Sequence, residues 1–148
     1  SLLRLPASVS PMRELAEGGF QPVLIPPLED GLAVETLVLC SGRIYFDLQS
    51  RHGGRSDYAI VRIEQLYPFP DTELQDALAA YPNARRMLWV QDEPQNQGPW
   101  RFMAYHLRQV SQLPIRYVGR PESASPATGY LEMHKAQLER ILDETFSG

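Results

Sequence analysis

The sequence contains a single cysteine, Cys40, among its 148 residues. One thiol cannot form a disulfide framework, nor a zinc or iron–sulfur site that requires several thiolates. Because Cys40 closes the apolar run 36–40, we expect a small buried side chain rather than a nucleophile. No apolar run in the sequence approaches the roughly 20 residues that a membrane-spanning helix needs.

The sequence also lacks the common motifs for phosphate binding, covalent catalysis and zinc binding. The patterns G-x-G-x-x-G, G-x-x-x-x-G-K-[ST], G-x-S-x-G and H-E-x-x-H do not occur. The three histidines, His52, His106 and His134, lie far apart along the chain. We therefore expect this region to have no assembled nucleophile and base, and hence no active site of its own.

An excess of positive charge is absent as well. The 14 basic and 18 acidic side chains give a formal net charge of −4. General binders of nucleic acid or of membrane surfaces use a net positive field, so the charge disfavours both classes. Hydrophobic residues make up 43% of the chain and charged residues 22%, which is typical of a folded globular domain.

Proline is abundant and unevenly placed. The chain has 13 prolines, of which five precede residue 28 and none lies between Leu28 and Tyr67. This distribution predicts a connecting arm over residues 1–34, followed by a folded domain over residues 35–148. We expect the arm to lead from an upstream domain of a longer protein and its apolar residues to dock on a surface.

Four apolar or β-branched runs, at residues 36–40, 58–63, 87–91 and 115–118, predict strands. A helical pattern follows each run, which predicts an α/β fold with a mostly parallel sheet and flanking helices. In the second of these helices, Thr72 and Gln75 have the spacing of a capping box.

Ligands of open parallel sheets bind beyond the carboxyl ends of the strands, so the loops there are the candidate sites. After the third strand, Asp92 and Glu93 are adjacent carboxylates, which can share acid and base roles or hold a divalent cation. The nearby amides and the large aromatic residue favour an interface instead. The interface candidates are Glu93, Asn96, Gln97 and Trp100.

The loop after the fourth strand, residues 119–129, precedes a predicted helix. Backbone N–H groups at a helix start, hydroxyl side chains and an arginine can together hold an anion. The alternative is a structural turn in which serine and threonine satisfy backbone groups. The anion-binding candidates in this loop are Arg120, Ser123, Ser125 and Thr128.

Several segments together resemble one enzyme family. They are I-E-Q-L-Y-P-F-P at 63–70, Q-D-E-P-Q-N-Q-G-P-W at 91–100, Y-V-G-R-P-E-S-A-S-P-A-T-G at 117–129, L-C-S-G-R-I-Y-F-D-L at 39–48 and S-L-L-R at 1–4. Their identity and order resemble the C-terminal region of the decarboxylating first component of 2-oxoglutarate dehydrogenase complexes, a transketolase-like thiamine-diphosphate enzyme family. The chain departs from the family pattern at Asp92, where glutamate is usual, at Pro99, where alanine is common, and at Arg43, where lysine is usual.

The resemblance implies a domain of transketolase C-terminal type at the end of a much longer chain. In that family, thiamine diphosphate and magnesium bind to upstream domains through G-D-G and N-N motifs, which this sequence lacks. The parent enzyme would decarboxylate 2-oxoglutarate and succinylate the lipoyl group of dihydrolipoyl succinyltransferase in the tricarboxylic acid cycle. The isolated region would be inactive and would support packing on the upstream catalytic domains and homodimer assembly.

The resemblance also implies possible regulation and a location. Some family members respond to AMP or acetyl-CoA, so Arg4 and Arg43 join Arg120 as candidate effector contacts. The expected location is the bacterial cytoplasm, or the mitochondrial matrix in a eukaryote. Three other readings stay open: a free-standing flavodoxin-like binder of a phosphorylated ligand or nucleotide, a ligand-free protein-interaction module, and the same domain of a 2-oxoadipate dehydrogenase.

Overall fold

The computed structural model describes residues 20–27, 31–122 and 131–147. In these residues the strands are β1 (Val23–Leu24), β2 (Thr36–Cys40), β3 (Tyr58–Ile63), β4 (Arg86–Pro94) and β5 (Ile115–Arg120). The helices are the 3-10 helix η2 (Gly31–Ala33), α2 (Ile44–His52), α3 (Asp71–Ala79), α4 (Trp100–Val110) and α5 (Leu131–Thr145).

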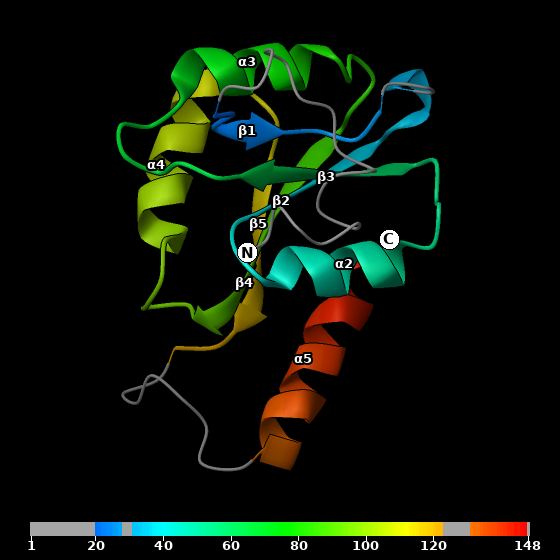
Figure 1. Ribbon diagram of the computed structural model, residues 1–148, viewed down its shortest axis with the longest axis vertical. Helices are drawn as coiled ribbons and strands as arrows, with labels where there is room; N and C mark the ends of the chain where they lie inside the picture. Colours follow the sequence, from blue (N-terminus) through cyan, green and yellow to red (C-terminus); the bar gives the residue numbers. More distant parts are fainter. Residues whose placement is uncertain (1–19, 28–30, 123–130, 148) are drawn as a thin grey trace.

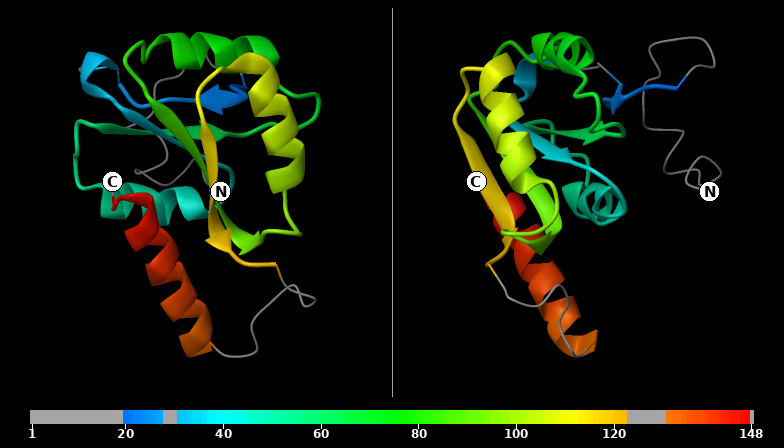
Figure 2. Two further views of the ribbon diagram at one scale, coloured as in Figure 1. Left: turned by 180° about the vertical axis from the view of Figure 1, so that it is seen from behind. Right: turned by 90° about the vertical axis from the view of Figure 1, so that its left-hand side faces the viewer.

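The five strands form one sheet in the order β1-β3-β2-β4-β5 (Figure 1). β2, β3, β4 and β5 run parallel, and β1 pairs antiparallel with β3 at one edge. Seen from behind, β5 lies between α4 and α5 (Figure 2). The predicted α/β fold with a mostly parallel sheet and flanking helices is therefore confirmed.

Helices cover both faces of the sheet, which explains why every residue of β2 and β3 is buried and most of them are apolar. Leu37, Leu39 and Trp89 face the core beneath α3 and α4. Val38 and Val90 face a second core beneath α2 and α5. Figure 1 shows this arrangement, with α3 and α4 in its upper left part and α2 and α5 below.

Charged side chains fasten α5 to the elements beside it. Arg51 of α2 forms ion pairs with Glu139 and Asp143, and Arg116 of β5 pairs with Glu144 at 3.1 Å. The Phe146 ring, just beyond the helix, lies 5.1 Å from the Tyr58 ring at the start of β3. The last helix thus closes a core whose other members lie far away in the sequence.

The sequence did not predict one short strand, and one local prediction is wrong. β1 lies inside the predicted arm, and its residues Val23 and Leu24 are buried against β3. The predicted capping box at Thr72 is wrong, because α3 begins at Asp71 after Pro70 and has no side-chain cap. Asp71 and Glu73 in the first turn complement the positive end of the helix dipole instead.

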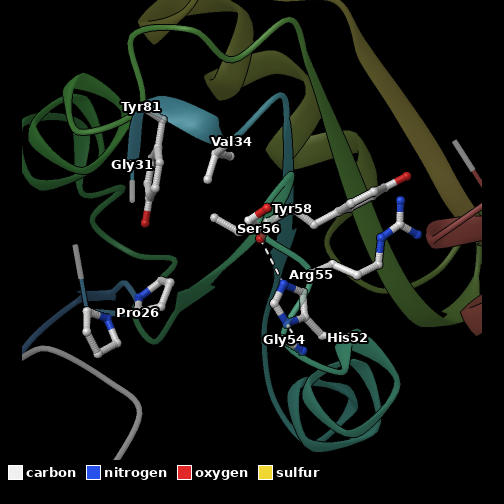
Figure 3. A pocket seen from close by; sticks show the side chains of 11 residues that line it. Pro26, Gly31, Val34, His52, Gly54, Arg55, Ser56, Tyr58 and Tyr81 are labelled. Atoms are coloured by element: carbon white, nitrogen blue, oxygen red, sulfur yellow. Dashed lines mark hydrogen bonds between the residues drawn. The ribbon is translucent and has the colours of Figure 1, made fainter. Parts of the chain in front are cut away.

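A cavity of about 250 Å³ lies beside the start of β3, with Tyr81 on one side and His52 and Ser56 on the other (Figure 3).

In the segments that the structure describes, no helix is both long enough and apolar enough to cross a lipid bilayer.

Cys40 is completely buried at the end of β2, and this burial raises the pKa of its thiol from 9.0 to about 12. The thiol therefore stays protonated and packs as a small apolar group, as the sequence predicts.

The buried thiol predicts a loss of stability at alkaline pH. Above pH 9 the unfolded chain releases the Cys40 proton while the folded chain retains it, so the free energy of unfolding falls as the pH rises from 9 toward 12. At pH 10 the loss of stability relative to pH 7 is on the order of 1 kcal/mol. Urea unfolding of the chain and of Cys40→Ala at both pH values measures the difference; equal falls in the two proteins would contradict the assignment.

Candidate functional site

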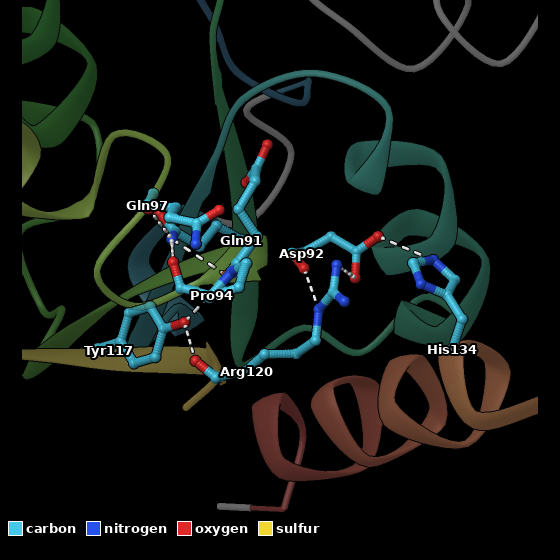
Figure 4. Close-up of polar contacts among 8 residues, drawn as sticks. Gln91, Asp92, Pro94, Gln97, Tyr117, Arg120 and His134 are labelled. Atoms are coloured by element: carbon cyan, nitrogen blue, oxygen red, sulfur yellow. Dashed lines mark hydrogen bonds and ion pairs between the residues drawn. The ribbon is translucent and has the colours of Figure 1, made fainter. Parts of the chain in front are cut away.

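The candidate site lies at the carboxyl ends of β4 and β5 (Figure 4). The two strands pair in regular parallel register up to Val90 and Val118, and an irregularity then separates Val90 from Pro94, which pairs with Arg120. This is the sheet edge at which parallel α/β proteins place ligand-binding loops. The last residues of β4, 91–94, and the turn 95–99 lead from there to α4, and we refer to residues 91–99 together as the loop 91–99.

A buried amide organises this loop. The Trp89 ring N–H donates to Gln91 Oε1 at 2.9 Å, and Gln91 itself is only 2% exposed. Gln91 Nε2 donates to the carbonyl oxygens of Glu93 (3.2 Å), Pro94 (3.0 Å) and Gln97 (2.8 Å). One side chain thus connects three backbone carbonyls at the end of β4 and in the turn that follows it.

Tyr117 and Gly98 also determine the conformation of this loop. The Tyr117 hydroxyl lies 2.5 Å from the Arg120 carbonyl oxygen and 3.2 Å from that of Glu93. Burial raises the pKa of Tyr117 to about 12, so the hydroxyl keeps the proton it donates. Gly98 has φ +67°, and a Cβ there would lie 3.1 Å from the Glu93 side chain, which restricts this position to glycine.

A second group of polar contacts at these strand ends joins Arg120, Asp92 and His134. Arg120 is 7% exposed; its Nε donates to the Asp92 carbonyl oxygen, and its Nη2 lies 3.6 Å from Asp92 Oδ1. His134 of α5 places Nε2 3.4 Å from Asp92 Oδ2. Asp92 thus connects β4 to β5 and to α5.

The two adjacent carboxylates do not converge. Asp92 faces Arg120 and His134, whereas the side chain of Glu93 is exposed. Successive strand residues point to opposite faces, which accounts for the separation. Within the described ranges, no group of three or more His, Cys, Asp or Glu side chains is arranged to hold a metal ion.

One further carboxylate, that of Asp47, lies near Asp92. The pKa of Asp47 on α2 is raised, first by burial and then by the nearby charges of Asp92 and Glu139, while Arg43 acts in the opposite direction. The start of α2, the end of β4 and α5 therefore meet in a region of mixed charge. Arg43 is exposed at the N-cap position of α2.

Only some of the sequence-based candidates lie among the described residues. Arg43 and Arg120 have the positions just given, and the remaining anion-binding candidates, Arg4, Ser123, Ser125 and Thr128, lie outside the described residues. Among the interface candidates, Glu93 and Asn96 are exposed and Gln97 is half-buried. Trp100 is half-buried, packs against the core beneath α3 and α4, and has its ring 5.4 Å from that of Tyr117.

The structure adds a buried cation that the sequence analysis missed. Arg62, near the end of β3, is 1% exposed, and its Nε lies 2.8 Å from Glu64 Oε2. Its guanidinium lies over the rings of Tyr45 and Phe46, at 4.8 and 5.1 Å from their centres. The sequence did contain a signal for this pair. An arginine within an apolar run is followed two residues later by a glutamate, which lies on the same face of a strand.

The three Gln91 contacts predict a large effect of one substitution. Gln91→Leu removes the acceptor of the buried Trp89 N–H and the donor of three carbonyls, so the free energy of unfolding should fall by about 2–4 kcal/mol. Urea unfolding measures it, with Gln109→Leu on the exposed surface of α4 as the control, expected to change stability by less than about 0.5 kcal/mol. A matching small effect at Gln91 would show that the loop is held by other contacts.

Comparison with known proteins identifies the family. A family model described as 2-oxoglutarate dehydrogenase C-terminal matches residues 9–146. The 2-oxoglutarate dehydrogenase E1 component of Azotobacter vinelandii is 47% identical, that of Cupriavidus necator 42%, and the 2-oxoadipate dehydrogenase complex component E1 of Homo sapiens 40%. Each match covers 99% of this chain but 16% of the relative. The chain therefore belongs to the family of 2-oxoglutarate dehydrogenase E1 C-terminal domains.

Proposed function

We propose that this chain acts as the C-terminal region of an enzyme that decarboxylates 2-oxoglutarate and succinylates the lipoyl group of a dihydrolipoyl succinyltransferase in the tricarboxylic acid cycle. The observation that supports this most directly is the 47% identity to an E1 component over 99% of the chain. Helices pack on both faces of the sheet, and hydrogen bonds hold the loop 91–99 in one conformation. Both features suit a domain that packs against other domains of a larger protein.

The parent enzyme would use thiamine diphosphate and magnesium bound by its upstream domains. The residues described here do not fit that cofactor. The Asp92 carboxylate already contacts Arg120 and His134, and the exposed Glu93 side chain does not converge with it. When bound upstream, the cofactor would supply the stabilisation of the carbanion that decarboxylation forms. The part of this chain in the reaction is structural, and the chain alone would be inactive.

The loop 91–99 suits a role in assembly. Its backbone is fixed by Gln91 and Tyr117, so Glu93 and Asn96 are presented at defined positions on the surface. Preorganised polar groups beside a half-buried aromatic residue, here Trp100, are typical of protein interfaces. We propose that this surface contributes to packing on the catalytic domains and to homodimer formation.

An effector site is a further part of the proposal. Arg43 is an exposed cation beside the start of α2, where backbone N–H groups also favour an anion. Arg4, Arg120, Ser123, Ser125 and Thr128 are the other candidate contacts for the phosphate groups of AMP or acetyl-CoA. Location in the bacterial cytoplasm, or in the mitochondrial matrix of a eukaryote, follows from this function.

The 40% identity to a 2-oxoadipate dehydrogenase component makes that activity the second candidate. The full polypeptide that contains this chain, supplied with thiamine diphosphate and Mg²⁺, is expected to reduce ferricyanide with a kcat/KM at least ten-fold higher for 2-oxoglutarate than for 2-oxoadipate. The 148-residue chain alone should give no turnover. A preference for 2-oxoadipate would select the second candidate, and turnover by the chain alone would contradict the structural role.

The effector proposal predicts a selective loss of activation. Arg43→Ala in the full polypeptide should raise the concentration of AMP or acetyl-CoA needed for half-maximal activation about ten-fold, because one phosphate-binding cation is lost. Arg85→Ala removes another exposed arginine, one whose Nη1 lies 3.8 Å from Glu35 Oε1, and should leave activation unchanged. Equal activation curves for the two variants would refute a role for Arg43.

A further inference from the structure

The strand β5 forms an open edge of the sheet. It is the last strand in the order β1-β3-β2-β4-β5, and across residues 20–27, 31–122 and 131–147 it pairs only with β4. Helices α4 and α5 flank it (Figure 2), so they cover its side chains rather than its outer backbone edge. At the opposite edge of the sheet, by contrast, β1 covers the end of β3.

Hydrogen bonds at the two ends of β5 show which of its backbone groups face this edge. The Met87 N–H donates to the Pro114 carbonyl at 2.9 Å, and the Gln95 N–H donates to the Arg120 carbonyl at 3.0 Å. Backbone groups alternate in direction along a strand, so the even-numbered residues of β5 face β4 and the odd-numbered residues face outward. The outward residues are Ile115, Tyr117 and Gly119. No backbone hydrogen bond from the described part of the chain reaches their N–H or C=O groups.

Nothing within β5 prevents another strand from pairing with these groups. Natural sheets protect an open edge with proline, charged side chains or a bulge. The six residues of β5 include no proline, and the irregularity at Val90 and Pro94 lies on the side of β4. Both arginines of the strand are engaged on its inner side, Arg116 with Glu144 at 3.1 Å and Arg120 with Asp92. The edge is therefore a template for strand pairing.

The outward residues are complementary to a second copy of themselves. In an antiparallel pair about a twofold axis at Tyr117, this residue lies opposite Tyr117 of the second copy, and Ile115 lies opposite Gly119. Each of these pairs is in the hydrogen-bonded position and exchanges both N–H···O bonds. Every outward backbone group of both copies is then satisfied.

Other positions of the axis fit less well. An axis at Arg116 would place the two Arg116 side chains directly opposite each other, and like charges in such pairs are destabilising. An axis at Val118 would place Ile115 opposite Pro121, which has no N–H to donate. The sequence of β5 thus favours the axis at Tyr117.

The side chains also suit this register. On the α4 side the larger Ile115 would face Gly119, a position restricted to glycine because a Cβ there would lie 2.4 Å from the Tyr117 hydroxyl. On the α5 side Arg116 would face the apolar Val118 of the second copy. Each Arg116 keeps its own counter-ion, Glu144, so the pairing buries no unpaired charge.

We propose that β5 pairs antiparallel with β5 of a second copy of this chain, about a twofold axis at Tyr117, so that two sheets become one. The inference deepens the proposed role in homodimer formation, on which it rests, by naming the strand and the register. The loop 91–99 adjoins this edge, since Pro94 pairs with Arg120 at the end of β5. Its exposed polar groups would therefore lie at the rim of the same interface.

A disulfide placed on the axis traps the pair. Cα atoms of a hydrogen-bonded antiparallel pair lie about 5.5 Å apart, within the range of about 4.4–6.8 Å that a disulfide spans. Under mild oxidation Tyr117→Cys should give at least ten-fold more covalent dimer than Tyr105→Cys, whose side chain is 62% exposed on α4. The native Cys40 is 0% exposed and should not react. Adding Ile115→Pro removes an outward N–H at the first residue of the strand, where proline is tolerated, and should lower the yield at least ten-fold. Ile115→Val keeps the N–H and should leave the yield unchanged.

Amide exchange tests the same pairing without any substitution. With rising concentration of the 148-residue chain, the amides of the outward residues Ile115, Tyr117 and Gly119 should exchange at least ten-fold more slowly. The amides of Arg116 and Val118 face β4 in either state and should not change. This alternation distinguishes strand pairing from any other association of the chain.

The inference is overturned if Tyr117→Cys forms no more covalent dimer than Tyr105→Cys, or if exchange of the outward residues is independent of concentration. The full polypeptide separates this failure from that of the proposed function, when its mass, amide exchange and 2-oxoglutarate turnover are measured on one sample. An active homodimer with fast exchange of the outward residues refutes the β5 pairing alone. A homodimer with slow exchange but no turnover refutes the proposed function alone.

Discussion

The Trp89 indole is buried in the core beneath α3 and α4, and its ring N–H must find an acceptor there. Gln91, two residues later on the same face of β4, provides it at 2.9 Å. The amide of Gln91 then needs acceptors of its own, and it finds them among the carbonyls of the loop that follows. The Trp89 N–H thus fixes the orientation of the Gln91 amide, and the Gln91 amide in turn fixes the backbone of the loop at the end of the strand. The exposed groups of the candidate interface, Glu93 and Asn96, lie on the loop that this path helps to fix.

Two buried arginines mark the same end of the sheet. Arg62 is stabilised by Glu64 and by two aromatic rings, and Arg120 by the side chain and the carbonyl of Asp92. A buried ion pair adds little net stability, because desolvation opposes the attraction, but loss of one partner is costly. These pairs therefore fix the positions of the strand ends more than they raise stability. His134 joins the second pair and connects it to α5.

Strand positions could be predicted well from the sequence, because buried parallel strands are continuous apolar runs: the runs at 36–40 and 58–63 match β2 and β3 residue for residue. β1 was not predicted, since two residues next to prolines have no periodicity. The capping box at Thr72 failed because the N-cap is Pro70, two residues earlier, and the helix begins at Asp71. The contacts of Gln91 could not be predicted, because side-chain bonds to an irregular loop leave no spacing signal. The placement of α5 against β4 and β5 required the tertiary structure.

The position of α5 has a consequence for synthesis on the ribosome. Val38, Tyr58 and Ile60 face the core that α5 covers, yet α5 is made about 70 to 100 residues after them. The core under α3 and α4 can close once β5 has emerged, whereas the opposite face of the same sheet stays partly open until the last helix is available. During that interval a chaperone, or the remainder of a longer nascent chain, would meet an apolar surface that the finished domain no longer exposes.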